Sequence, residues 1–223
     1  MSHDRISVQE STQRCEQDTP LVILDHHHLI NLLHSFPKRY LLIGSGVRLQ
    51  YAKPERAIKD TLNTLRADSK ERTLIIFGGD TANSLKPDLG YLVQQVKEQA
   101  DDVIKVLSVQ SWPERCDFVD YVFRYPREFR DESRSRELWG GTLDGLPVAA
   151  TRHYLSPDVQ MLLNAVICIG GGVIAKQELS YALQQGQVEH HYIRAEVRHD
   201  RDLGIYGPTD EWYQRQGYLT KKH

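Results

Sequence analysis

Cysteine is scarce in this chain of 223 residues, which contains only three. Cys15, Cys116 and Cys168 are odd in number and lie far apart in the sequence. Disulfide frameworks and zinc clusters need cysteines in closely spaced sets, so neither is predicted. We expect a reducing compartment, and we interpret Cys168, which lies within an apolar run, as a small core residue.

Long apolar runs and an excess of one charge are also missing. No stretch approaches the roughly 20 apolar residues that span a bilayer. Residues 1–20 are polar and lack the apolar core of a signal peptide. The formal net charge is −2 and no long basic run occurs, so there is no electrostatic basis for nucleic-acid binding. The sequence therefore predicts a cytoplasmic protein with neither a membrane nor a nucleic-acid partner.

Short apolar runs alternate with amphipathic segments along the chain. The apolar runs predict strands at residues 40–43, 73–77, 103–109, 119–123, 165–169 and 188–197, with a further short strand at 146–150. Helical patterns begin after Asp25, at Pro54, at Pro87, after Ser156 and near Ile174. This alternation predicts a Rossmann-like, doubly wound α/β fold with a mostly parallel sheet and helices on both faces.

We expect one such domain over residues 20–199. A flexible leader is predicted over residues 1–19, because they carry little apolar periodicity. Residues 200–223 mix charges and aromatics without a clear period, and are interpreted as a tail that packs on the domain or on a partner.

Three of the predicted strands end in glycine clusters. These are Gly44-Ser45-Gly46, Gly78-Gly79-Asp80, and Gly170-Gly171-Gly172 followed by Val173. Glycine lets the backbone approach a ligand closely, and N–H groups at the start of a helix favour a phosphate. Because parallel strands finish at the same edge of a sheet, we expect all of these residues to form one nucleotide-binding cleft. Asp80 is either a ligand for a ribose hydroxyl or a cap of the next segment.

The best-known nucleotide-binding motifs do not fit these turns. The spacing of Gly44 and Gly46 needs a third small residue at position 49, which is Leu49. No Lys-Ser or Lys-Thr pair follows any of the glycine runs. The sequence therefore predicts neither an ordinary Rossmann dehydrogenase nor a P-loop NTPase.

The stretch from Gly170 to Glu178 resembles the motif P-G-G-x-G-T-x-x-E of LOG proteins, often described as lysine-decarboxylase-like, in the Rossmann-like SLOG superfamily. The two central glycines and Glu178 match at the right spacing after a buried strand. Gly170 replaces the proline of the motif, Ile174 its last glycine and Ala175 its threonine. The likeness covers roughly residues 40–195.

The resemblance implies a nucleotide or nucleotide-derived ligand and a homodimer. We expect no cofactor and no metal. In the catalytic members, an Arg and the Glu of the motif serve to cleave the base–ribose bond of nucleoside monophosphates. Departure of a base leaves oxocarbenium-like charge on the ribose, which a buried carboxylate stabilises. Glu178 matches that Glu, whereas Leu155 stands at the position of the Arg. Arg152 and His153 are close by, and either could neutralise the phosphate or assist the leaving base. Glu178 and Arg152 are therefore the catalytic candidates.

Other interpretations stay open. Glu178 is alternatively an ordinary acid in the first turns of a helix, favoured there by the helix dipole. The departures at Ile174, Ala175 and the Arg position favour a non-catalytic nucleotide sensor or carrier.

The histidines suggest a distant alternative. Residues 25–28, Asp-His-His-His, resemble the manganese-binding Asp-His-His motif of DHH phosphoesterases, but the aspartates which that family needs upstream are missing. His190 and His191 lie in a predicted strand, so their rings are expected on opposite faces.

Overall fold

The computed structural model describes much of the predicted domain. The described residues are 21–23, 26–44, 49–66, 71–78, 87–100, 102–110, 118–124, 142–143, 146–147, 157–171, 175, 178–179, 182 and 188–199. The predicted leader and tail, Cys15 and Cys116 lie outside these residues.

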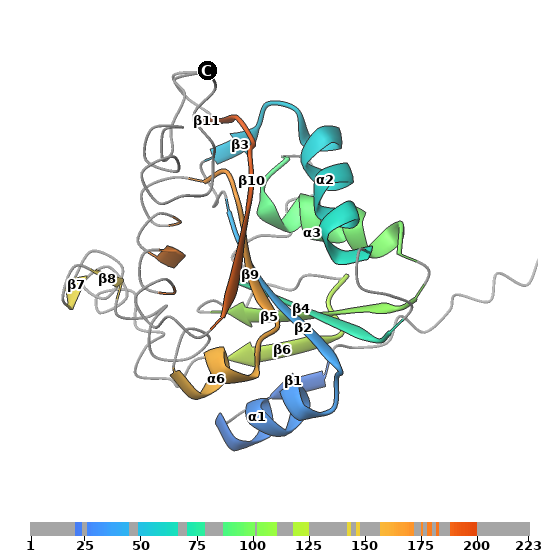
Figure 1. Cartoon of the computed structure of the whole chain (residues 1–223), viewed down its shortest axis with the longest axis vertical. Coiled ribbons are helices and arrows are strands. Elements are labelled where there is room, and N and C mark those ends of the chain that lie inside the picture. The colour runs from blue at the N-terminus through green and yellow to red at the C-terminus, as the bar shows by residue number, and fades with distance from the viewer. Residues whose placement is uncertain are drawn as a thin grey trace, which may run out of the picture.

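A seven-stranded sheet in the order β1-β6-β5-β4-β2-β9-β10 forms the centre of the fold (Figure 1). Its strands are β1 (Leu21–Ile23), β2 (Lys38–Ile43), β4 (Thr73–Gly78), β5 (Ile104–Gln110), β6 (Tyr121–Arg124), β9 (Ala165–Ile169) and β10 (Glu189–Ile193). Every neighbouring pair is parallel. Central parallel strands are buried on both faces and read as continuous apolar runs, which is why their sequences are recognisable.

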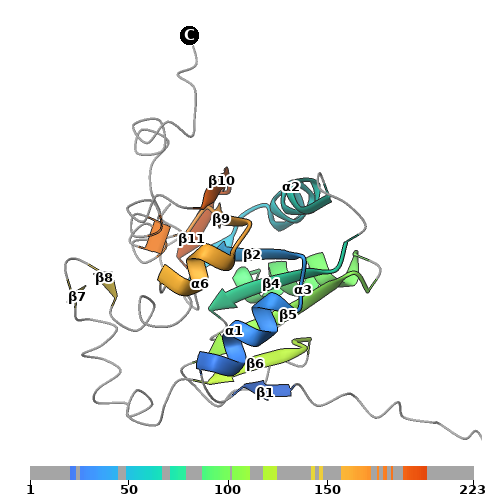
Figure 2. The ribbon, with the colours of Figure 1, turned by 60° about the horizontal axis from the view of Figure 1, so that its bottom comes forward.

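Helices cover both faces of the sheet, so the predicted Rossmann-like, doubly wound α/β fold is confirmed. Helices α2 (Pro54–Arg66) and α3 (Leu89–Glu98) pack on one face, and α1 (His26–His34) and α6 (Pro157–Leu162) pack on the other (Figure 2). Alternate residues of β2 enter the two cores, with Tyr40 and Leu42 on the α2–α3 side and Leu41 and Ile43 on the α1–α6 side.

The helix starts follow from local sequence. Pro54 is the first residue of α2, where a fixed φ and a missing N–H do no harm. Pro87 instead precedes the start of α3. Helix α3 begins at Leu89, because the carboxylate of Asp88 accepts a 3.0 Å hydrogen bond from the Tyr91 N–H and so caps the helix.

The strand order reverses next to β2. From β2 the chain adds β4, β5 and β6 successively on one side, and then β9 returns to pair with the other side of β2. In open α/β sheets the crevice at such a reversal, beyond the carboxyl ends of the strands, is where ligands bind.

The long strand predicted at residues 188–197 is wrong as a single element. Strand β10 ends at Ile193, and the chain resumes as β11 (Val197–His199), which pairs antiparallel with β3 (Leu49–Tyr51). The sequence analysis did not predict β3. Glu196 lies between the two strands and accepts a 3.0 Å hydrogen bond from the Ala52 N–H, so the chain changes pairing partners at this point.

The short strand predicted at residues 146–150 is confirmed at residues 146–147, and residues 148–150 lie outside the described part of the chain. Strand β8 (Leu146–Pro147) pairs antiparallel with β7 (Thr142–Leu143) in a separate two-stranded ribbon. In the described part of the chain, no helix is both long and apolar enough to cross a membrane.

Candidate functional site

Two of the predicted glycine turns meet at the strand-order reversal. Gly44 directly follows β2, and Gly170 and Gly171 directly follow β9, its parallel neighbour. A Cβ placed on Gly171 would lie 3.2 Å from the carbonyl oxygen of Gly44 and 3.3 Å from its carbonyl carbon. The backbones of the two turns are therefore in direct contact, with no side chain between them.

The third turn begins at the same edge of the sheet. Gly78 is the last residue of β4, the other parallel neighbour of β2, and it is exposed. The remaining predicted ligand-binding residues lie outside the described part of the chain; they are Ser45, Gly46, Gly79, Asp80, Gly172 and Val173.

The close approach expected at the glycines occurs, but the group approached is the protein's own chain. A Cβ on Gly44 would collide with the hydroxyl of Tyr51 and lie 3.0 Å from Cδ1 of Leu89. Gly170 has a φ of +55°, and a Cβ there would lie 2.6 Å from the carbonyl oxygen of Ala195. The backbone contact and the left-handed φ favour glycine at position 170 whichever ligand the turns receive, whereas at position 44 the crowding comes mainly from the side chains of Tyr51 and Leu89.

Gly171 has the same kind of constraint. Its φ is +101°, and a Cβ would lie 2.5 Å from Cβ of Ala175. The N–H of Gly170 donates a 3.1 Å hydrogen bond to the carbonyl of Ile193 and so continues the pairing with β10. That N–H is therefore used within the fold.

Glu178 is buried, with 8% of its surface exposed. It is helical, as are Ala175, Leu179 and Ala182, whose side chains pack into the core on the α1–α6 side. Glu178 follows by about one helical turn the alanine that abuts Gly171. Both interpretations of Glu178, as a site residue and as an acid favoured by the helix dipole, stay predictions.

Glu178 is unusual among the described acidic side chains because it is buried. Among the acidic side chains that the structure describes, only Asp88 and Glu178 are buried, and Asp88 caps α3. Removing a carboxylate from water is unfavourable unless other groups compensate for it. Its place on the helix after the β9 turn fits a role at this edge of the sheet. Arg152, the other catalytic candidate, lies outside the described residues.

No protein-family model matches this chain, and no curated protein matches its sequence. The resemblance to LOG proteins therefore stays a prediction from the glycine turns and the motif that ends at Glu178.

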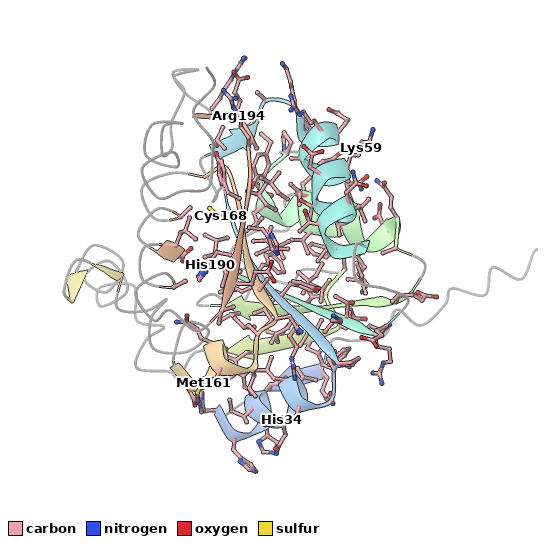
Figure 3. The ribbon with its side chains drawn as sticks, viewed as in Figure 1. His34, Lys59, Met161, Cys168, His190 and Arg194 are labelled. Atoms are coloured by element: carbon pink, nitrogen blue, oxygen red, sulfur yellow. The ribbon has the colours of Figure 1, made fainter. Side chains whose placement is uncertain are left out.

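His190 lies away from the glycine turns. It pairs in register with Val166, near the start of β9, whereas the glycines follow Ile169 at its end. Figure 3 shows its ring on the side of β10 away from α2 and α3. Its Nε2 atom is buried without a hydrogen-bond partner among the described residues. Burial lowers the pKa of the His190 ring, a hydrogen bond with the Ala182 backbone opposes that shift, and nearby His191 adds to it.

The expectation that the two adjacent rings face opposite sides agrees with the pairing of β10. Tyr192, two residues after His190, packs on the α1–α6 core, whereas Ile193, two residues after His191, belongs to the α2–α3 core. His191 lies 3.2 Å from the carboxylate of Glu189 on the strand surface.

The histidines of α1 have other partners. Nε2 of His26 pairs with the carboxylate of Asp158 on α6, and the side-chain amide of Asn31 lies 3.1 Å from Nε2 of His27. Asp25 lies outside the described residues. Within those residues no three His, Cys, Asp or Glu side chains are grouped closely enough to hold a metal ion.

Sequence reasoning missed Tyr51, which is buried beneath the edge that carries the glycines. Its hydroxyl donates a 2.8 Å hydrogen bond to the carbonyl of Ile169, and its N–H donates a 2.7 Å hydrogen bond to the carbonyl of Pro87. The strand that carries Tyr51 has three residues, too few for a periodic pattern to be recognised.

Proposed function

We propose that this protein binds a nucleoside monophosphate across the turns that follow β2, β4 and β9. The observation that carries the proposal is the direct contact of Gly44 with Gly171 at the point where the strand order reverses. Two backbone turns in direct contact at the carboxyl edge of a parallel sheet suit a phosphate and its ribose.

We further propose hydrolysis of the N-glycosidic bond of that nucleotide, with Glu178 as the central residue. In this reaction the bond between the base and the anomeric carbon breaks, water adds its oxygen to that carbon, and the base leaves with a proton. The products are the free base and ribose phosphate. The Glu178 carboxylate would stabilise the positive charge that develops on the ribose and would orient the attacking water. Arg152 would neutralise the phosphate.

A non-catalytic nucleotide sensor or carrier is the second candidate. Ile174 and Ala175 depart from the catalytic motif. The N–H of Gly170 is engaged by Ile193 and does not remain for a ligand. Nucleotide binding without base release is the result that this function predicts. The homodimer and the cytoplasmic location stay predictions for either function.

A thermal-shift screen with chemical analysis of each well tests these functions. Purified protein is heated with AMP, GMP, CMP or UMP, with inorganic phosphate and free nucleosides as controls, and free base is quantified by chromatography. At ten times Kd, a bound nucleotide adds about 1.4 kcal/mol of stability, which raises Tm by about 3–6 °C. Absence of a shift with every nucleotide would contradict nucleotide binding.

Variants of two glutamates separate the functions. Glu178→Gln removes the charge at similar volume, and Glu98→Gln changes an exposed acid on α3 that bonds only to Gln94 and Gln95 among the contacts described. Hydrolysis predicts base release by the wild type and by Glu98→Gln, with at least a hundredfold loss in Glu178→Gln. A thermal shift with intact nucleotide in all three proteins would instead support the sensor or carrier.

A further inference from the structure

Tyr51 contacts the chain next to each of the three predicted ligand-binding turns. Its hydroxyl bonds to the carbonyl of Ile169, immediately before the β9 turn, and lies against Gly44, in the β2 turn. Its N–H bonds to the carbonyl of Pro87, which leads into α3 after the β4 turn. Tyr51 thus contacts the ends of β2 and β9, the two strands at the reversal, and the segment between β4 and α3.

The surroundings of Tyr51 leave it little freedom. The residue is 2% exposed and belongs to the core beneath α2 and α3. Its strand is held by β11, with Tyr51 in register with Val197. Figure 1 shows this β3–β11 pair at the end of the sheet where β10 finishes. Ala195 lies two residues before β11, and its carbonyl approaches Gly170.

We propose that Tyr51 is a positioning residue of the nucleotide site, a role that rests on the proposed function. Its hydroxyl sets the spacing between the β2 and β9 turns, so that both backbones are already placed when the ligand arrives. Preorganisation of this kind increases affinity because ordering is complete before binding. Loss of the hydroxyl also leaves the buried carbonyl of Ile169 without this donor, which favours rearrangement of the turn.

A purely structural tyrosine would affect stability alone, and Tyr40 provides the matched control. Tyr40 is also 2% exposed, lies in the same core and is held by contacts of its own. It pairs in register with Ala165 at the start of β9, far from the glycine turns. Tyr51→Phe and Tyr40→Phe therefore each remove one hydroxyl from one core, but only the first changes the proposed site.

The experiment is calorimetric titration of wild type, Tyr51→Phe and Tyr40→Phe with AMP, GMP, CMP and UMP, at a temperature well below the Tm of each protein. We expect Tyr51→Phe to bind the nucleotide about tenfold more weakly than wild type. A tenfold change in Kd corresponds to the typical net contribution of about one hydrogen bond. The Kd of Tyr40→Phe should stay within about twofold of the wild-type Kd, because a substitution far from the proposed site is not coupled to binding there.

Hydrogen exchange of the ligand-free proteins provides the second readout. The amides of residues 43–44 and 169–171, next to the two turns, should exchange faster in Tyr51→Phe than in Tyr40→Phe. Equal affinity of Tyr51→Phe and wild type, or an equal loss in both variants, would overturn the positioning role. If wild type binds none of the nucleotides, the proposed function itself fails and the role of Tyr51 in binding fails with it, whatever the exchange pattern.

Discussion

Gly171 lies so close to Gly44 that a Cβ on the former would sit 3.2 Å from the carbonyl oxygen of the latter. The two residues are separated by most of the chain, yet each directly follows one of the two parallel strands at the strand-order reversal. The contact follows from the parallel pairing of β2 and β9, which places both glycine turns at one edge of the sheet. Glycine is favoured at position 171 before any ligand is considered, because its φ is +101° and a Cβ there would also lie 2.5 Å from Cβ of Ala175.

Gly170→Ala should destabilise the protein strongly. The backbone there has a φ of +55°, and the new Cβ would lie 2.6 Å from a backbone oxygen that cannot move freely. We expect a loss of about 2–4 kcal/mol in the free energy of unfolding, from left-handed strain together with overpacking. Urea denaturation followed by circular dichroism measures this loss.

Gly78→Ala is the control for that substitution. Gly78 is exposed and its φ is not in the left-handed region. Its effect should remain within about 0.5 kcal/mol, as for most surface changes. Equal effects of the two substitutions would refute the role assigned to the Gly170 contacts.

Gly44→Ala and Tyr51→Phe should be energetically coupled. The Cβ at position 44 would collide with the Tyr51 hydroxyl, so removal of that hydroxyl makes room for the methyl group. The double variant should therefore be more stable than the sum of the single changes predicts, by about 1 kcal/mol. Chemical denaturation of the four proteins in this cycle gives the coupling energy, and additive effects would argue against the contact.

How well each part of the fold was predicted depends on how local its determinants are. The strand at residues 165–169 matches β9 in full, because an all-apolar run is bounded by a polar asparagine and by glycine. The strand predicted at 188–197 failed because its division depends on β3, a partner about 150 residues earlier in the chain. No periodicity in a single segment reveals such an exchange of partners.

In the candidate site, too, only the features that depend on local sequence could be predicted. The glycines and Glu178 were recognisable as residue types at particular spacings, and the common edge of Gly44, Gly78 and Gly170 follows from parallel topology. The contacts of Tyr51 were not predictable, since they join a three-residue strand to Ile169 and Pro87. The burial of Glu178 likewise depends on how its helix packs on the sheet.

Stability should decrease in mild acid because of His190. Burial lowers the pKa of its ring below the value of 6.5 expected in the unfolded chain. As the pH falls below that value, the unfolded state takes up a proton that the folded state does not yet bind, so the free energy of unfolding falls. The loss continues until the pH passes the lower pKa of the folded state.

Two variants identify the residue responsible for this pH dependence. His190→Gln does not titrate and should flatten the dependence of unfolding free energy on pH between 7 and 5. His34→Gln serves as the control, because His34 is exposed at the end of α1, on another element of the fold. An unchanged slope in His190→Gln would assign the acid sensitivity to other groups.

The most direct test of the central claim is an amide-resolved NMR titration of the full chain with AMP, GMP, CMP and UMP. Binding at the strand-order reversal predicts that at least one nucleotide shifts the amide resonances of Gly44, Gly78 and Gly171 in a saturable manner. The amides of Arg39 and Asn164 lie at the amino ends of β2 and β9, where the Arg39 N–H donates to the side-chain oxygen of Asn164 and the Asn164 N–H donates to the Arg39 carbonyl. These two resonances should stay unchanged. Unchanged glycine resonances with all four nucleotides, or shifts confined to the Arg39–Asn164 end, would contradict the account.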